Sequence, residues 1–299
     1  MRSIMTAPRK LKPNPANHIV NAITVDVEDY FQVSAFEPYI KRNDWDATPS
    51  RVERNTNRIL DIFDNCGVKS TFFTLGWVAE RYPGLIKRLV AEGHELASHG
   101  YSHVRVPCQT REEFRDDIVR TRKLLEDIGG CRVSGYRAAS FSINSNTLWA
   151  LDELQEAGYR YSSSIYPIHH DIYGMPTAPR FSFYPNGKGG LLEVPITTLS
   201  IMNQRLPSGG GGYFRLLPYF ISRWSLKRVN RKDRQPCVFY FHPWEIDPEQ
   251  PRPQGLAAKT RFRHYVNLKR MESRLVSLLG EFHWDRMDRI FLDDVSVGE

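Results

Sequence analysis

The 299-residue sequence lacks the long apolar runs, paired cysteines and repeats that mark several classes of protein. It contains no stretch of about 18 apolar residues, so we expect no membrane-spanning segment. The 4 cysteines lie far apart without a C-x-x-C pair, which favours reduced thiols in a cytoplasmic chain over a disulfide framework. Residues 1–17 are basic and proline-rich but lack the apolar core of a secretory signal. We expect a disordered lead-in there and one domain over residues 18–299.

The sequence also has little excess of charge, because 41 Lys and Arg residues against 34 Asp and Glu residues leave a net charge of +7. Such an excess would suit an anionic polymer or a membrane surface, and peripheral association with a membrane is compatible with it. Ordinary solubility explains the charge equally well, so we expect no nucleic-acid partner. Apolar residues make up 41% of the chain, which excludes a disordered or collagen-like protein.

Short β-rich apolar segments alternate with amphipathic segments along the chain. Strands are predicted at 22–27, 69–75, 95–98, 132–138, 159–163, 191–196 and 238–241. Helices are predicted at 51–63, 83–92, 110–128, 146–157, 216–229 and 261–279. This alternation is typical of βα units around a parallel sheet. About seven such units favour an α/β fold of the distorted (β/α) barrel type over an open sheet.

Three of the predicted strands end in polar side chains, and these are Asp26, Glu28 and Asp29, then His99 and His103, and finally His242. Because active sites collect at the carboxyl ends of parallel strands, we expect the three groups to meet in one pocket. Two histidines and a carboxylate can bind a metal and leave positions open for water or a substrate oxygen. A spare carboxylate could take a proton from water, and a spare histidine could protonate a leaving amine. The set is suited to amide hydrolysis.

The segments around these residues resemble the motifs of the NodB-like polysaccharide deacetylases, carbohydrate esterase family 4. HELASHGYSH at 94–103 closely matches the second motif of that family. TVDVED at 24–29 resembles the first motif with one residue interposed, as in the branch similar to allantoinases and a peptidoglycan deacetylase. GYRAASF at 135–141 resembles the third motif, and the strand before His242 resembles the fifth. Beyond about residue 245, the chain resembles the C-terminal extension of deacetylases linked to exopolysaccharide and exosortase loci.

The resemblance implies a divalent metal bound by His99, His103 and one carboxylate. Strand alternation favours Glu28, which shares a face with Asp26, whereas a bend in the strand would bring Asp29 inward instead. Zinc is the metal we expect first, and this set of ligands also accepts iron, cobalt or nickel.

The resemblance also implies the catalytic groups. Asp26 would be the general base that activates water, Arg137 would pair with it and orient it, and His242 would protonate the departing amine. Ala139 stands where the family has proline, so the loop that holds Arg137 loses stiffness. The fourth motif is expected near Glu193, which could orient His242.

We therefore expect a metal-dependent hydrolase that removes N-acetyl groups from the amino sugars of an exopolysaccharide or a peptidoglycan-like polymer. One alternative is an amidase of the same superfamily that acts on a small cyclic amide such as allantoin. Another is a non-catalytic carbohydrate-binding protein, which would need none of Asp26, Arg137 and His242.

Other features have plainer interpretations. Core packing is the expectation for the aromatic residues beside the motifs, although they could stack on sugars: Trp77, Tyr101, Phe141, Tyr166 and Trp244. The HHD sequence at 169–171 is expected on the surface. The glycines at 209–212 precede no Lys-Ser/Thr pair, so they indicate a flexible lid rather than a phosphate-binding loop.

Overall fold

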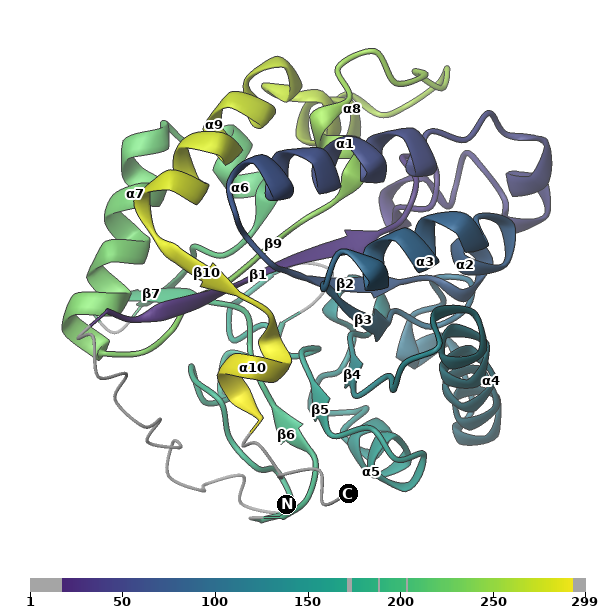
Figure 1. Ribbon diagram of the computed structural model, residues 1–299, viewed down its shortest axis with the longest axis horizontal. Coiled ribbons are helices and arrows are strands. Elements are labelled where there is room, and N and C mark those ends of the chain that lie inside the picture. Colours follow the sequence, from purple (N-terminus) through teal and green to yellow (C-terminus); the bar gives the residue numbers. More distant parts are fainter. Residues whose placement is uncertain (1–17, 171–173, 188, 203, 293–299) are drawn as a thin grey trace.

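The computed structural model describes residues 18–170, 174–187, 189–202 and 204–292. The predicted lead-in at 1–17 lies outside these residues. Eight parallel strands form one strongly curved sheet, an incomplete (β/α) barrel with helices around its outside (Figure 1). The predicted fold class is confirmed. Within the described residues, no helix combines the length and the apolar character that a membrane crossing needs.

The strands of this sheet are β1 (Val20–Val27), β2 (Thr71–Thr74), β3 (Glu95–Ser98), β4 (Gly135–Tyr136), β5 (Tyr161–Ser162), β6 (Leu192–Glu193), β9 (Val238–Phe241) and β10 (His283–Asp285). β1 lies next to one edge of the sheet, with β9 and β10 on one side and β2 to β6 in chain order on the other. The last strand, β10, pairs with the first residues of β1. The chain beyond residue 245 therefore contributes to the same sheet.

The helices are α1 (Val52–Asn65), α2 (Gly76–Arg81), α3 (Pro83–Ala91), α4 (Arg111–Gly129), α5 (Trp149–Glu156), α6 (Gly211–Leu216), α7 (Tyr219–Arg228), α8 (Ala258–Tyr265), α9 (Leu268–Glu281) and α10 (Met287–Phe291). Thr110 caps α4 in a capping box with Glu113, as their spacing suggests. The helix expected at 261–279 is two helices, because Asn267 adopts a left-handed conformation with φ of 52°.

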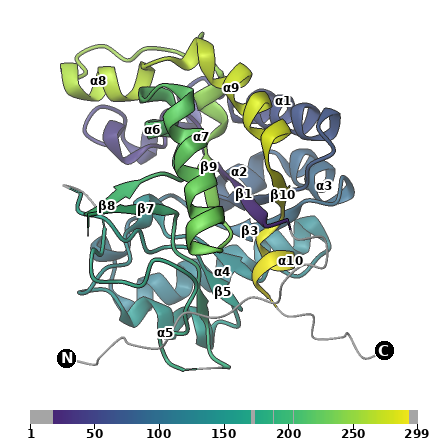
Figure 2. The ribbon, with the colours of Figure 1, turned by 90° about the vertical axis from the view of Figure 1, so that its left-hand side faces the viewer.

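The barrel is open between β6 and β9, which do not pair with each other. The antiparallel hairpin of β7 (Thr198–Ile201) and β8 (Gln204–Pro207) lies beside α7 in this region (Figure 2). Gly209 and Gly210 then run along β9, and the carbonyl of Gly209 accepts a hydrogen bond from the Tyr240 amide at 2.7 Å. A Cβ on Gly209 would overlap the carbonyl oxygen of Val238. The expectation of a flexible lid was wrong for Gly209 to Gly211, which are buried, and Gly209 allows a close approach of two backbones; Gly212 is exposed.

The strands pack as a parallel sheet that is covered on both faces. Seven consecutive residues of β1 are buried, and so are all residues of β2, β3 and β9. Asp26, at the carboxyl end of β1, is therefore buried, with only 2% of its surface exposed.

Candidate active site

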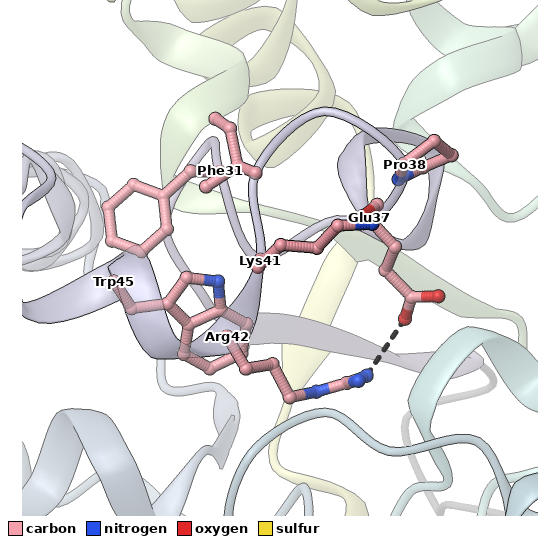
Figure 3. Close-up of a pocket in the computed structure, with 7 residues that line it drawn as sticks. Phe31, Glu37, Pro38, Lys41, Arg42 and Trp45 are labelled. Carbon is pink, nitrogen blue, oxygen red and sulfur yellow. Dashed lines mark hydrogen bonds and ion pairs between the residues drawn. The ribbon is translucent and has the colours of Figure 1, made fainter.

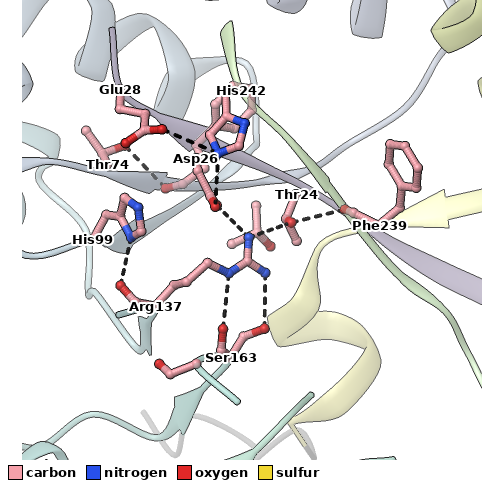
Figure 4. Close-up of polar contacts among 12 residues, drawn as sticks. Thr24, Asp26, Glu28, Thr74, His99, Arg137, Ser163, Phe239 and His242 are labelled. Carbon is pink, nitrogen blue, oxygen red and sulfur yellow. Dashed lines mark hydrogen bonds and ion pairs between the residues drawn. The ribbon is translucent and has the colours of Figure 1, made fainter. Parts of the chain in front are cut away.

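The carboxyl ends of four strands bring the candidate residues together (Figure 4). Asp26 lies at the end of β1, and His99, Arg137 and His242 follow β3, β4 and β9 directly. β1 pairs with both β2 and β9, and β3 pairs with β4, so the sheet fixes the spacing between these four positions. The structure thus brings together the three groups of polar residues that the sequence predicts to meet.

Glu28, His99 and His103 form a buried cluster whose candidate ligand atoms all lie within 4.8 Å of one another. Glu28 Oε2 lies 3.0 Å from His103 Nε2, yet it accepts no hydrogen bond within the described part of the chain. Burial lowers the pKa of both histidines, that of His103 well below its usual value, so the two imidazoles are neutral. Neutral imidazoles beside a carboxylate oxygen without a donor are the ligands that a divalent cation needs, so the residues fit such an ion.

The loop after β3 is not helical, yet it directs the imidazoles of His99 and His103 toward the same point. Gly100 has a φ of 73°, and a Cβ there would lie 2.9 Å from a carboxylate oxygen of Asp117. That carboxylate accepts a hydrogen bond from the Tyr101 amide at 3.1 Å, and His103 itself has a φ of 54°. The Nδ1 atom of His99 lies 2.7 Å from the carbonyl oxygen of Arg137. When Nδ1 donates a hydrogen bond to this carbonyl oxygen, Nε2 of His99 is unprotonated and carries the free lone pair of the ring.

Asp29, the alternative carboxylate, lies elsewhere. Its Oδ2 atom accepts hydrogen bonds from Ser50 Oγ at 2.7 Å and from the amides of Arg51 and Val52 at 2.6 and 2.9 Å. These amides are at the start of α1, so Asp29 holds the N-terminus of this helix. The structure therefore places Glu28, and not Asp29, beside the two histidines.

Asp26 is paired with a fully buried arginine. Arg137 Nη1 donates to Asp26 Oδ1 at 2.5 Å and to Thr24 Oγ1 at 2.8 Å. The remaining guanidinium nitrogens bind the carbonyl oxygen and the hydroxyl of Ser163, and the guanidinium lies 4.0 Å from the centre of the Phe73 ring. Each guanidinium nitrogen of Arg137 thus has a hydrogen-bond partner, which fixes the orientation of the Asp26 carboxylate. The second oxygen of Asp26, Oδ2, faces His242 Nε2 at 4.0 Å.

His242 presents its Nε2 atom to the site because its Nδ1 atom is bound to Glu245 Oε1 at 2.7 Å. The other oxygen of Glu245 accepts a hydrogen bond from Arg215 Nε at 2.6 Å, and this arginine is buried. Burial would lower the pKa of His242, but the hydrogen bond to Glu245 and the nearby Glu28 carboxylate raise it to about 9. His242 is thus prepared to give up a proton from Nε2.

The carboxylate that orients His242 was assigned wrongly from the sequence. Glu193 Oε1 accepts hydrogen bonds from the amides of Ser164 and Ile165 at 2.9 and 2.8 Å, so it fixes the loop after β5. Glu245 takes the expected role instead. The H-P-x-E spacing after β9 could have indicated it, because residues three apart at a helical turn face one another.

The aromatic residues beside the motifs mostly pack inside the protein. Trp77, Phe141, Tyr166 and Trp244 are all buried, which confirms the core-packing expectation for these four. The Trp244 ring stacks between the rings of His242 and His264, with centroid distances of 5.1 and 4.1 Å. His169 is exposed, as expected, while residue 171 lies outside the described residues.

These features define a class of protein: a distorted (β/α) barrel with a two-histidine, one-carboxylate cluster beside a separate carboxylate and a separate imidazole. A model of the polysaccharide deacetylase family matches residues 43–162, and a model named Domain of unknown function (DUF3473) matches residues 163–292. Residues 43–162 therefore match a polysaccharide deacetylase domain. The narrower link to exosortase loci stays a prediction.

Curated relatives match between a third and two-fifths of the chain. A peptidoglycan-N-acetylglucosamine deacetylase of Bacillus cereus is 35% identical over 99 residues, which are 33% of this chain and 36% of the relative. A peptidoglycan deacetylase of Helicobacter pylori is 30% identical over 117 residues, 38% of each protein. The matched segments thus span less than two-fifths of the length of these relatives.

Solved structures share the fold over nearly the whole chain. A protein from Mycobacterium smegmatis assigned to the polysaccharide deacetylases has a TM-score of 0.62 at 19% identity, and covers 95% of this chain and 93% of its own. The PuuE allantoinase has a TM-score of 0.57 at 15% identity, with 96% of both chains covered. At these identities the likeness concerns the fold.

The boundary between the two family models falls within the barrel and does not separate two sheets. Their boundary falls at the end of β5, and β6, β9 and β10 continue the sheet in the second region. His99 and Arg137 lie in the first region, His242 in the second, and Asp26 precedes both. The region of unknown function therefore contributes one wall of the candidate site, including Glu245.

Proposed function

We propose that this protein is a metal-dependent deacetylase that hydrolyses the N-acetyl groups of amino sugars in a polysaccharide. The observation that carries the proposal is the pairing of two separate proton-transfer groups on either side of one ligand cluster. Asp26 is fixed by Arg137, and His242 is fixed by Glu245, with Glu28 between them. A protein that only bound sugars would need neither pair.

Each residue has a defined task in the proposed reaction. Glu28, His99 and His103 would hold a divalent cation, which when bound supplies a Lewis acid for the acetyl oxygen and for the attacking water. Asp26 accepts the proton of that water at Oδ2, the oxygen that Arg137 leaves unoccupied. His242 donates the proton on Nε2 to the departing amine nitrogen.

The surroundings of these groups support their tasks. The carboxylate of Glu245 stabilises the protonated imidazole of His242, and Arg215 keeps that carboxylate charged by lowering its pKa to about 2, although burial opposes the shift. The walls around Asp26 are buried side chains, so water other than the reacting molecule is largely excluded. The products would be acetate and a sugar amine.

Zinc remains the metal we expect first, with iron, cobalt or nickel as alternatives. The cytoplasmic location and the division into a lead-in and one domain also remain predictions. The polymer is proposed as an exopolysaccharide or a peptidoglycan-like chain.

The deciding experiment measures acetate release from N-acetylated glycans and from allantoin, with metal analysis on the same sample. We expect turnover of the glycans, a divalent metal near one per chain, and no hydrolysis of allantoin. The variant Asp26→Asn should keep the metal and lose turnover, whereas Asp64→Asn, an exposed carboxylate on α1, should behave like the wild type. Hydrolysis of allantoin alone would favour the small-amide alternative, and glycan binding without acetate release would favour the binding protein.

A further inference from the structure

A pocket of about 400 Å³ lies in the long connection between β1 and α1. Phe31 and Trp45 are its buried apolar walls, and Glu37, Lys41 and Arg42 supply its polar groups (Figure 3). Its volume is in the range of small-ligand sites, which are typically about 300–1,000 Å³. Connections of this length at the carboxyl end of a barrel strand are commonly functional.

The pocket adjoins the candidate active site through Arg42. Its Nε atom donates to the carbonyl oxygen of Ser102 at 2.9 Å, and its Nη2 atom donates to that of His103 at 3.1 Å. The same connection is tied to the third motif by a hydrogen bond of 2.8 Å between the hydroxyls of Ser34 and Ser140. The segment that forms the pocket is thus attached to the loop that carries His103 and to the loop after β4.

The polar groups of the pocket favour a ligand with a negative charge. Its single carboxylate, Glu37, is already engaged by Arg42 at 2.9 Å and by Arg105 at 3.6 Å. The ammonium group of Lys41 is exposed and donates only to the carbonyl oxygen of Glu37, at 3.3 Å; among the described residues it meets no carboxylate. The indole nitrogen of Trp45 is buried without a hydrogen-bond acceptor there. The polar groups of the pocket therefore include more hydrogen-bond donors than acceptors, and a ligand could supply the acceptor that they lack.

We propose that this pocket is a subsite for a carboxylate-bearing sugar that neighbours the acetylated sugar on the same polymer. This inference rests on the proposed function. The apolar walls of Phe31 and Trp45 would pack against the sugar ring, and Lys41 would pair with the carboxylate. A uronic acid and the lactyl ether of muramic acid offer the same group, and the test separates the two.

The test compares deacetylation of three oligosaccharides of equal length that contain N-acetylglucosamine. One alternates with glucuronate, as in hyaluronan, one alternates with muramic acid, and one is neutral chitin oligosaccharide. Hyaluronan oligosaccharide with its carboxyl groups reduced to alcohols is the matched uncharged control. We expect a KM about three- to tenfold lower for at least one carboxylated substrate than for its uncharged counterpart, with similar kcat, and a smaller difference at high salt.

The variant Lys41→Gln should remove this preference by raising KM for the carboxylated substrate about three- to tenfold, while turnover of the neutral oligosaccharide stays normal. Lys232→Gln, an exposed lysine beyond α7, is the matched control and should change neither value. Equal KM values for all substrates, or an unchanged preference in Lys41→Gln, would overturn the subsite while turnover of the neutral substrate upholds the deacetylase.

If no oligosaccharide is deacetylated, the proposed function fails and the subsite is judged by binding alone. Calorimetric titrations of the glucuronate-containing and the muramic-acid-containing oligosaccharides then decide the matter. Saturable binding that is weakened in Lys41→Gln, but not in Lys232→Gln, supports the pocket. Absent or unaltered binding overturns it.

Discussion

Replacement of Glu245 by glutamine is the sharpest test of how His242 is prepared for proton donation. The substitution keeps the shape of the side chain but removes the charge that faces His242 Nδ1 at 2.7 Å. Glu245 is buried, and Arg215 holds its other oxygen, so water cannot replace the lost charge. The imidazolium form of His242 should therefore be less favoured, and fewer molecules should be able to protonate the leaving amine.

The size of the effect follows from the bond that is weakened. A hydrogen bond to a charged group contributes about 1.5–3 kcal/mol, and about 1.4 kcal/mol corresponds to a factor of ten in rate. We expect kcat to fall by about 10- to 150-fold in Glu245→Gln. The metal content should not change, because Glu245 is not part of the cluster of Glu28, His99 and His103.

The assay is the release of free amine at saturating glycan, with metal analysis and thermal unfolding on the same preparation. Glu249→Gln, an exposed carboxylate four residues away, is the control and should keep the wild-type kcat. An unchanged kcat in a folded, metal-loaded Glu245→Gln protein would refute the assigned role of Glu245. A loss of metal together with activity would mean that the two sites are not independent.

Three further predictions concern the metal and the loops. Chelation should abolish acetate release, and added Zn²⁺ or Co²⁺ should restore it; activity that survives complete metal removal would disprove the metal's role. Glu28→Gln should lose bound metal, whereas Asp29→Asn should keep it and unfold at a lower temperature, because the start of α1 loses about 1–2 kcal/mol of stabilisation. Metal analysis and calorimetry would show the reverse if the two carboxylates were misassigned. Ala139→Pro should leave kcat and thermal stability near wild type, because Ala138 already has the extended conformation that precedes proline; a large drop in unfolding temperature would contradict this.

Much of the architecture could be predicted from the sequence because each strand is a short apolar run between helical segments. β3 and β9 have the predicted bounds, since polar residues follow both directly. The hairpin of β7 and β8 and the strand β10 were not predicted. Their residues are partly exposed and show weak patterns, so contacts with the barrel decide their conformation.

The candidate site could likewise be predicted only in part from the sequence. Local spacing indicated His99 and His103, because two ligands four residues apart after a strand are visible in the sequence. Strand alternation favoured Glu28 over Asp29 but left Asp29 as an alternative. That choice depends on α1, whose free amides bind Asp29 and leave Glu28 to the histidines.

The sequence by itself thus determined the alternation of strands and helices, the resemblance to a family, and the types of residue available for metal binding and proton transfer. These depend on short-range patterns that a single chain displays directly. Only the tertiary structure decided that Glu28, directly after β1, meets His103 in the loop after β3, and that Arg215 of α6 binds the Glu245 carboxylate beside His242. It also formed the pocket around Lys41, whose walls come together when the connection after β1 binds the loop of His103. These contacts join residues that are far apart in the sequence, so no local sequence pattern predicts them.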